Sequence, residues 1–158
     1  MAIGIVSFPG SVGVEELKFL YERTLGQEVR VLAYTDESIR GIDVLVLPGG
    51  AAFGDAVRPG AIARLAPIAP SIRRFSRSGR VLGIGNGFQI LCELNVLKGT
   101  FLPNPGGRFV TALASMRVET QNSYINNAMD VGSVLTMPLS CYCGAYYADH
   151  RTTKDLDQ

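Results

Sequence analysis

The stretch Arg80-Val-Leu-Gly-Ile-Gly-Asn-Gly-Phe-Gln-Ile-Leu91 decides the fold of this chain. Its apolar start predicts a buried strand over 81–84, and the apolar spacing of 87–94 predicts a helix directly after it. A strand that enters a helix through such a tight turn is the geometry that exposes a reactive Ser or Cys at the edge of an α/β sheet. Gly85 stands at the tip of the turn and has no side chain to react. Because glycine tolerates strained backbone angles, the sequence predicts the shape of a nucleophile elbow without its nucleophile.

Strand and helix patterns alternate on the N-terminal side of this elbow as well. Apolar runs closed by Gly or Pro predict strands, and spacings of three and four residues predict helices. The expected strands are 2–8, 27–34 and 42–47, and the expected helices are 12–25 and 61–76. This order predicts a parallel sheet with helices on both faces and functional residues at the carboxyl ends of the strands.

The rhythm changes after Gly99. The segments 108–120, 131–139 and 145–148 alternate in part, which predicts a partly antiparallel C-terminal extension. We therefore expect one domain over residues 1–149, followed by a polar tail over 150–158 that has few apolar anchors and frays.

Composition narrows the function classes. A length of 158 residues with 47% hydrophobic and 18% charged residues is typical of a globular domain. A net charge of +1 gives no long-range attraction to nucleic acid or to a membrane surface, and we interpret Arg73, Arg74, Arg77 and Arg80 as a solvated helix face. Three cysteines and the lack of a signal-like or membrane-spanning apolar run indicate a reducing, cytoplasmic setting.

Two further patterns invite cofactor hypotheses. Cys141, Cys143 and His150 offer soft ligands, but the fourth ligand and the usual zinc-site spacing are missing, so we expect no metal and interpret the cysteines as buried thiols or an incidental pair. A relocated nucleophile among these thiols is disfavoured, because the one histidine lies in the tail. Gly83-Ile-Gly-Asn-Gly87 resembles a dinucleotide fingerprint, but Phe88 occupies the position of its last glycine, so we expect no cofactor.

Several motifs carry a resemblance to a known family. They are Ser7-Phe-Pro-Gly-Ser11, Leu47-Pro-Gly-Gly50, Phe53-Gly-Asp55, Arg58 with Gly60-Ala-Ile-Ala-Arg64, the stretch 81–91 and, more weakly, Met137-Pro-Leu and Tyr146-Tyr-Ala-Asp149. In these motifs the chain resembles the glutaminase subunits of phosphoribosylformylglycinamidine synthase, which are class I glutamine amidotransferases of purine biosynthesis. The resemblance implies a flavodoxin-like α/β fold. It also implies a cysteine thiolate at the elbow that attacks glutamine, a C-terminal His-Glu pair that activates it, and ammonia delivery to a larger synthetase partner.

The chain departs from the family at these catalytic positions. The family cysteine falls on Gly85, and the family's His-Gly-Glu-Gly stretch falls on Cys141-Tyr-Cys-Gly144. The Pro-His-Pro-Glu region has no counterpart in the sequence, which stops first. Covalent glutamine hydrolysis needs a nucleophile and a base within reach of each other, so we expect no glutaminase activity.

The oxyanion site is a separate question, because the resemblance implies that backbone N–H groups build it. The matching positions are Gly49, Gly50 and Ala51, together with Asn86 at the start of the elbow helix. Backbone donors do not depend on side-chain identity, so weak binding of glutamine or a small carboxylate is one interpretation. The other is that Pro48-Gly49-Gly50 is only a sharp exit from a strand.

Three functions stay open on the sequence. The leading hypothesis is a truncated, degenerate pseudoenzyme retained for binding a protein partner, either a synthetase subunit or a second copy of the chain. The alternatives are an engineered or incomplete version of an active subunit with cysteine at position 85, and a non-enzymatic scaffold component of an unrelated assembly. A chain that lacks the family's C-terminal segment is expected to leave an apolar sheet edge uncovered and therefore not to live as a free monomer.

Overall fold

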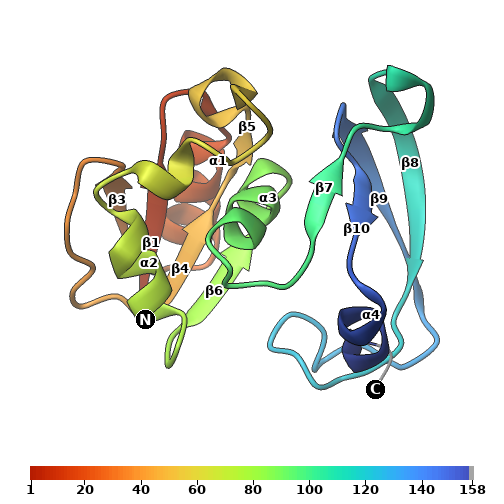
Figure 1. The fold of residues 1–158 in the computed structure, drawn as a ribbon. Helices are drawn as coiled ribbons and strands as arrows, with labels where there is room; N and C mark the ends of the chain where they lie inside the picture. The colour runs from red at the N-terminus through yellow and green to blue at the C-terminus, as the bar shows by residue number, and fades with distance from the viewer. Residues whose placement is uncertain (157–158) are drawn as a thin grey trace. The chain divides into compact units, whose positions relative to one another are not determined.

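The computed structural model describes residues 1–156 and divides the chain into two compact units (Figure 1). Unit 1 comprises Met1–Phe101 and Tyr146–Gln158, and unit 2 comprises Leu102–Ala145. Residues 157 and 158 lie outside the described part of the chain. In that described part, no helix combines the length and the apolar character needed to cross a lipid bilayer.

A parallel sheet forms the centre of unit 1. Its strand order is β3-β1-β4-β6. The strands are β1 (Ala2–Ser7), β3 (Glu28–Ala33), β4 (Val44–Leu47) and β6 (Arg80–Gly83), and each pairs in parallel with its neighbours. The apolar runs form central strands because side chains on both faces of such a sheet are buried. The predicted parallel sheet is confirmed.

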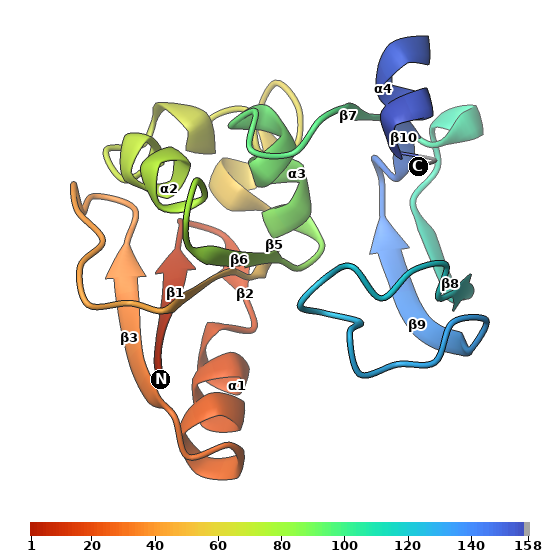
Figure 2. The same cartoon turned by 90° about the horizontal axis from the view of Figure 1, so that it is seen from below.

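Helices cover the two faces of this sheet. Ile3, Ile5 and Val46 point to one face and pack against α1 (Val14–Phe19), which continues as the π-helical turn η1 (Leu20–Thr24). Val6, Leu45 and Leu47 point to the other face, in the core cluster that contains residues of α2 (Ala69–Phe75) and α3 (Asn86–Glu93). Figure 2 shows α1 on one side of the sheet and α2 and α3 on the other. The predicted flavodoxin-like α/β class, with helices on both faces, is therefore confirmed.

The prediction of one continuous helix over 61–76 is wrong. The structure has a short 3₁₀ turn, η3 (Ala63–Leu65), followed by Ala66 in an extended conformation at φ −66° and ψ 147°. Pro67 follows directly, and the ring of a proline disfavours helical angles in the residue before it. α2 then begins at Ala69 with Pro70 in its first turn, where the missing N–H costs nothing.

Unit 2 contains the predicted antiparallel extension. β8 (Val110–Arg117) and β9 (Val134–Cys141) form a ladder that runs from Val110↔Cys141 to Arg117↔Val134. β9 begins later than the predicted residue 131, because the chain turns at 130–133, with Gly132 at φ +89°. β7 (Thr100–Leu102) and β10 (Ala145–Tyr147) form a second two-stranded pair where the chain passes between units, and a 3₁₀ turn, η4 (Pro105–Gly107), follows β7.

The described part of the tail is a helix, so the expectation that it frays was wrong there. α4 spans His150–Leu156. The carboxylate of Asp149 accepts a 2.7 Å hydrogen bond from the N–H of Thr152, which caps the helix and lowers the pKa of Asp149. Lys98 and Asp155 form an ion pair of 2.7 Å. Capping and a polar contact thus replace the apolar anchors that the sequence analysis looked for.

Candidate functional site

The elbow between β6 and α3 has the expected strained backbone. Gly85 adopts φ 53° and ψ −112°, a conformation that side-chain-bearing residues rarely adopt, so this prediction is confirmed. The N–H of Ile84 donates to the carbonyl of Leu47 at 2.9 Å, which holds the end of β6 beside the end of β4. Gly85 therefore lies at the carboxyl edge of the sheet, where functional residues of such folds gather.

The glycines of the elbow differ in what they are needed for. A Cβ on Gly87 would collide with the carbonyl oxygen of Leu47, and one on Gly83 would lie 2.8 Å from Leu91 Cδ1. These two glycines let α3 approach the sheet. A Cβ on Gly85 would meet only the Cα of Gly49, at the ordinary contact distance of 3.7 Å. The position has room for a side chain and carries none.

The segment predicted to supply oxyanion donors is held by the loop after β1. β5 (Gly49–Gly50) pairs in antiparallel fashion with β2 (Ser11–Val12). The N–H of Ala51 donates to the carbonyl of Gly10 at 2.9 Å, so this expected donor is engaged within the chain. The structure does bring Gly49 beside Gly85, and it links the 49–52 segment to the start of α3 through Asn86.

The side chain of Asn86 is the polar junction of the site. It is 5% exposed, and its Oδ1 accepts the N–H of Ala52 at 3.0 Å. Its Nδ2 donates to Asp55 Oδ1 at 3.0 Å and to Gln89 Oε1 at 2.9 Å. Burial raises the pKa of Asp55, and the hydrogen bond from Asn86 opposes that rise. The sequence analysis gave Asn86 a backbone role only and missed this network, which joins residues far apart in the chain.

The segment that contains Asp55 is strained and is fixed at its end. Within and after the 3₁₀ turn η2 (Ala52–Asp55), the non-glycine residues Phe53, Asp55 and Val57 have φ values of 54°, 53° and 70°. Arg58 follows and forms an ion pair with Glu93 on α3, whose side chain is only 6% exposed. The sequence carries a signal for this pair, because an acid in the apolar stretch 86–94 is buried and a buried acid needs a partner.

The three cysteines are buried or partly buried in the structure. Cys92 is buried on α3, where it packs in the core, and burial together with the nearby Glu93 raises the pKa of its thiol to about 11. In unit 2, Asn104 organises the turn that carries Cys141 and Cys143, since its side chain donates to the carbonyl of Cys141 at 2.9 Å and accepts the N–H of Gly144 at 2.8 Å. Across residues 1–156, no group of three or more His, Cys, Asp or Glu side chains is placed to hold a metal ion.

Comparison with known proteins agrees with this geometry. Residues 2–158 match the family model of the CobB/CobQ-like glutamine amidotransferase domain. The chain belongs to this glutamine amidotransferase family. The parallel sheet and the elbow described above therefore belong to an amidotransferase domain. In this domain, position 85 is glycine.

Relatives of this amidotransferase domain include subunits of phosphoribosylformylglycinamidine synthase. The chain is 40% identical to the phosphoribosylformylglycinamidine synthase subunit PurQ of Moorella thermoacetica over 99% of its length, and 40% identical to PurQ of Rubrobacter xylanophilus over its whole length. Among solved structures, it matches a chain of PurLQS from Thermotoga maritima with a TM-score of 0.86 and 31% identity over 94% of its length. The chain spans 67%, 72% and 69% of these relatives. The suspected PurQ-like relationship is confirmed.

Proposed function

We propose that this amidotransferase domain is a homologue of the glutaminase subunit of phosphoribosylformylglycinamidine synthase that does not hydrolyse glutamine and acts as a binding subunit. The observation that carries the proposal is Gly85 at the tip of the elbow, with φ +53° and no side chain. Covalent hydrolysis needs a nucleophile, and no base, wherever it lies, activates a glycine. The setting in purine biosynthesis is supported by the names of the relatives.

No thiol of α3 replaces the missing nucleophile. Cys92 is the cysteine of that helix, and it is 4% exposed with a thiol pKa of about 11. A thiol that stays protonated at neutral pH and packs in the core is a poor nucleophile. The residues next to the tip, Ile84 and Asn86, have no nucleophilic side chain.

In this proposal, the elbow still binds a ligand although it no longer hydrolyses glutamine. The N–H groups of Gly50 and of Asn86, the first residue of α3, are the donors that we propose for a carbonyl or carboxylate oxygen. With the Ala51 N–H engaged by Gly10, binding of glutamine or a small carboxylate is expected to be weak. The free thiols of the three cysteines support a reducing, cytoplasmic setting.

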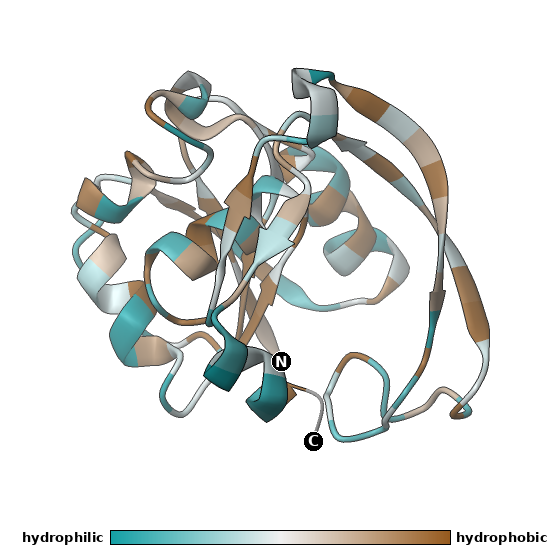
Figure 3. Cartoon of the chain, turned by 45° about the vertical axis from the view of Figure 1, so that its right-hand side comes forward, coloured by the Kyte–Doolittle hydropathy of each residue, from teal (hydrophilic) through white to brown (hydrophobic). Residues whose placement is uncertain are grey.

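A protein partner is the second part of the proposal. The register of the β8–β9 pair places apolar residues on one face over its whole length. Figure 3 shows hydrophobic positions, in brown, along both strands. This face consists of Val110, Ala112, Ala114, Met116, Leu135, Met137, Leu139 and Cys141. Met116 on it is 49% exposed, and Met137 and Leu139 are each 39% exposed. Exposed apolar surface of this kind marks interaction sites, and the matched chain of Thermotoga maritima comes from a structure of the PurLQS complex.

The partner that we propose is a large synthetase subunit of the PurL kind, with a second copy of the chain as the competing occupant. Size-exclusion chromatography of the chain with the synthetase subunit from the same genome tests this choice. We expect the two proteins to co-elute. Separate elution of both proteins at micromolar concentration would contradict the proposal.

A second candidate function is an engineered or incomplete version of an active subunit. It is favoured by the 3.7 Å of space that a Cβ on Gly85 would have, because that space accepts a cysteine. The codon at position 85 and the reading frame after Gln158 in the source genome decide between the two. A natural glycine codon supports the binding subunit, and a cysteine codon supports the active parent.

A further inference from the structure

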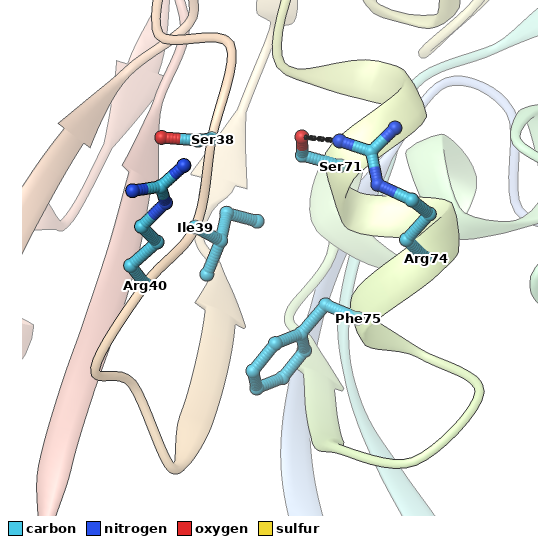
Figure 4. Close-up of a pocket in the computed structure, with 6 residues that line it drawn as sticks. All are labelled: Ser38, Ile39, Arg40, Ser71, Arg74 and Phe75. Atoms are coloured by element: carbon cyan, nitrogen blue, oxygen red, sulfur yellow. Dashed lines mark hydrogen bonds between the residues drawn. The ribbon is translucent and has the colours of Figure 1, made fainter.

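A hollow lies between α2 and the segment that joins β3 to β4, away from the elbow (Figure 4). Ser38, Ile39 and Arg40 line it from the joining segment, and Ser71, Arg74 and Phe75 line it from α2. Its volume of about 390 Å³ falls in the range of small-molecule sites.

Two arginines face this hollow without an acidic partner. Figure 4 shows Arg40 on the joining segment and Arg74 on α2. Across the described residues, the ion pairs of the structure involve neither of them. Guanidinium groups fit the oxygens of phosphate and carboxylate, so the two arginines offer hydrogen-bond donors to an anion in this hollow.

The wall on α2 is prearranged. The hydroxyl of Ser71 is buried and donates to the carbonyl of Glu37, and it accepts a hydrogen bond of 2.5 Å from Arg74 Nη2. The hydrogen bond from Arg74 to Ser71 holds the guanidinium in place. The hydrogen bond from Ser71 to Glu37 joins α2 to the segment between β3 and β4. The neighbouring Arg73 instead donates to the carbonyl of Leu94. The arginine cluster that the sequence analysis interpreted as one solvated face therefore divides into residues with different roles.

The floor of the hollow is apolar. Ile39 and Phe75 are partly buried and pack against the main core cluster, and this packing restricts the movement of their side chains. Phe75 also lies directly against Gly79, which leaves no room there for a Cβ. A fixed ring beside two cations suits a ligand that has both an anionic and an apolar or aromatic part.

We propose that this hollow binds a small phosphomonoester whose phosphate lies between Arg40 and Arg74 and whose apolar or aromatic part lies over Phe75. The site is separate from the elbow and does not depend on the chemistry at Gly85. The Ser38 hydroxyl, which lines the same hollow, supplies a further hydrogen-bond donor.

Calorimetric titration of the full chain with phenyl phosphate and with inorganic phosphate tests the proposal. We expect phenyl phosphate to bind more tightly than inorganic phosphate, and we expect Arg40→Ala and Arg74→Ala each to weaken its binding about tenfold. Arg77→Ala removes an equal charge from outside the hollow and is expected to leave the affinity unchanged.

Three results would overturn the site: no heat with either probe, equal affinity for both probes, or a loss in Arg77→Ala as large as that in Arg74→Ala. Arg40→Ala keeps the test decisive if Arg74→Ala loses stability along with its contact to Ser71, because Arg40 lies in an exposed connecting segment.

Discussion

Arg58 donates two hydrogen bonds to the carboxylate of Glu93, from Nε to Oε1 at 2.6 Å and from Nη2 to Oε2 at 2.8 Å. The pair joins the strained segment 53–57 to α3, the helix that starts at the elbow. It also raises the pKa of Arg58, chiefly through the hydrogen bonds. The pair thus ties the strained segment to the helix of the elbow.

Replacing Arg58 by alanine is expected to lower the free energy of unfolding by about 1–3 kcal/mol, because it leaves the buried Glu93 carboxylate without its main partner. Arg64→Ala is the matched control, since Arg64 lies 3.9 Å from the same carboxylate, and it is expected to cost less than about 0.5 kcal/mol. Urea unfolding of both variants measures the difference. Equal losses would show that Arg58 has no special role.

Gly85→Ala and Gly87→Ala separate backbone strain from steric collision. Gly85→Ala has space for its Cβ and is expected to cost about 1–2 kcal/mol, because φ +53° is unfavourable for alanine. Gly87→Ala is expected to cost about 3 kcal/mol or more, because its Cβ meets the backbone of Leu47 inside the core. Thermal or urea unfolding that ranks the two in the opposite order would refute this division of roles.

Gly85→Cys is expected to give a reactive thiol at the elbow. The new thiol lies at the N-terminus of α3, which lowers a thiol pKa, so it should react with iodoacetamide at neutral pH at least about tenfold faster than Cys92. Peptide mapping after timed alkylation reads both sites in one sample. Preferential labelling of Cys92 would contradict the description of both positions.

Cys92 also predicts a pH dependence of stability. The pKa of its thiol is about 11 in the folded chain against an ordinary value of 9.0, so the folded state keeps a proton that the unfolded state loses. The free energy of unfolding should therefore fall as the pH rises from 9 towards 11, and Cys92→Ala should show a smaller fall over the same range. Urea titrations at about pH 8 and about pH 10.5, on either side of the ordinary pKa of a thiol, compare the two proteins. An identical pH response in both would contradict the burial of the thiol.

The apolar face of the β8–β9 pair predicts that the isolated chain associates. Met137→Glu places a charge on that face and is expected to reduce self-association or partner binding, whereas Thr136→Glu, next to it on the opposite face, should not. Sedimentation velocity at micromolar concentration measures the effect. A monodisperse monomer that binds no synthetase subunit would show that the face needs no cover.

The sequence predicted the elements whose signal is local. Apolar runs identified β1, β3, β4 and β6, and the glycine at position 85 predicted the strained elbow. Pro67 interrupted a helix that periodicity alone predicted as continuous, because apolar spacing carries no information on the restriction that a proline ring places on the residue before it. The helical tail was missed because its cap, Asp149, is a single polar residue.

The site was harder to predict than the fold, because its contacts join distant parts of the chain. The Gly10 carbonyl that engages Ala51, the Asn86 amide that holds Ala52 and Asp55, and the Arg58–Glu93 pair each connect segments that have no shared periodicity. Of these contacts, only the Arg58–Glu93 pair has a signal in the sequence, because Glu93 is an acid among apolar neighbours.

The central claim is that an elbow with glycine at its tip does not hydrolyse glutamine. Glutamate formation by the purified chain, measured with a coupled dehydrogenase assay in the presence of the proposed synthetase partner, tests it most directly. The account predicts no glutamate above the blank, because position 85 offers no nucleophile. Turnover within about tenfold of an ordinary glutaminase, near the usual range of about 1–1,000 s⁻¹ for enzymes, would contradict it.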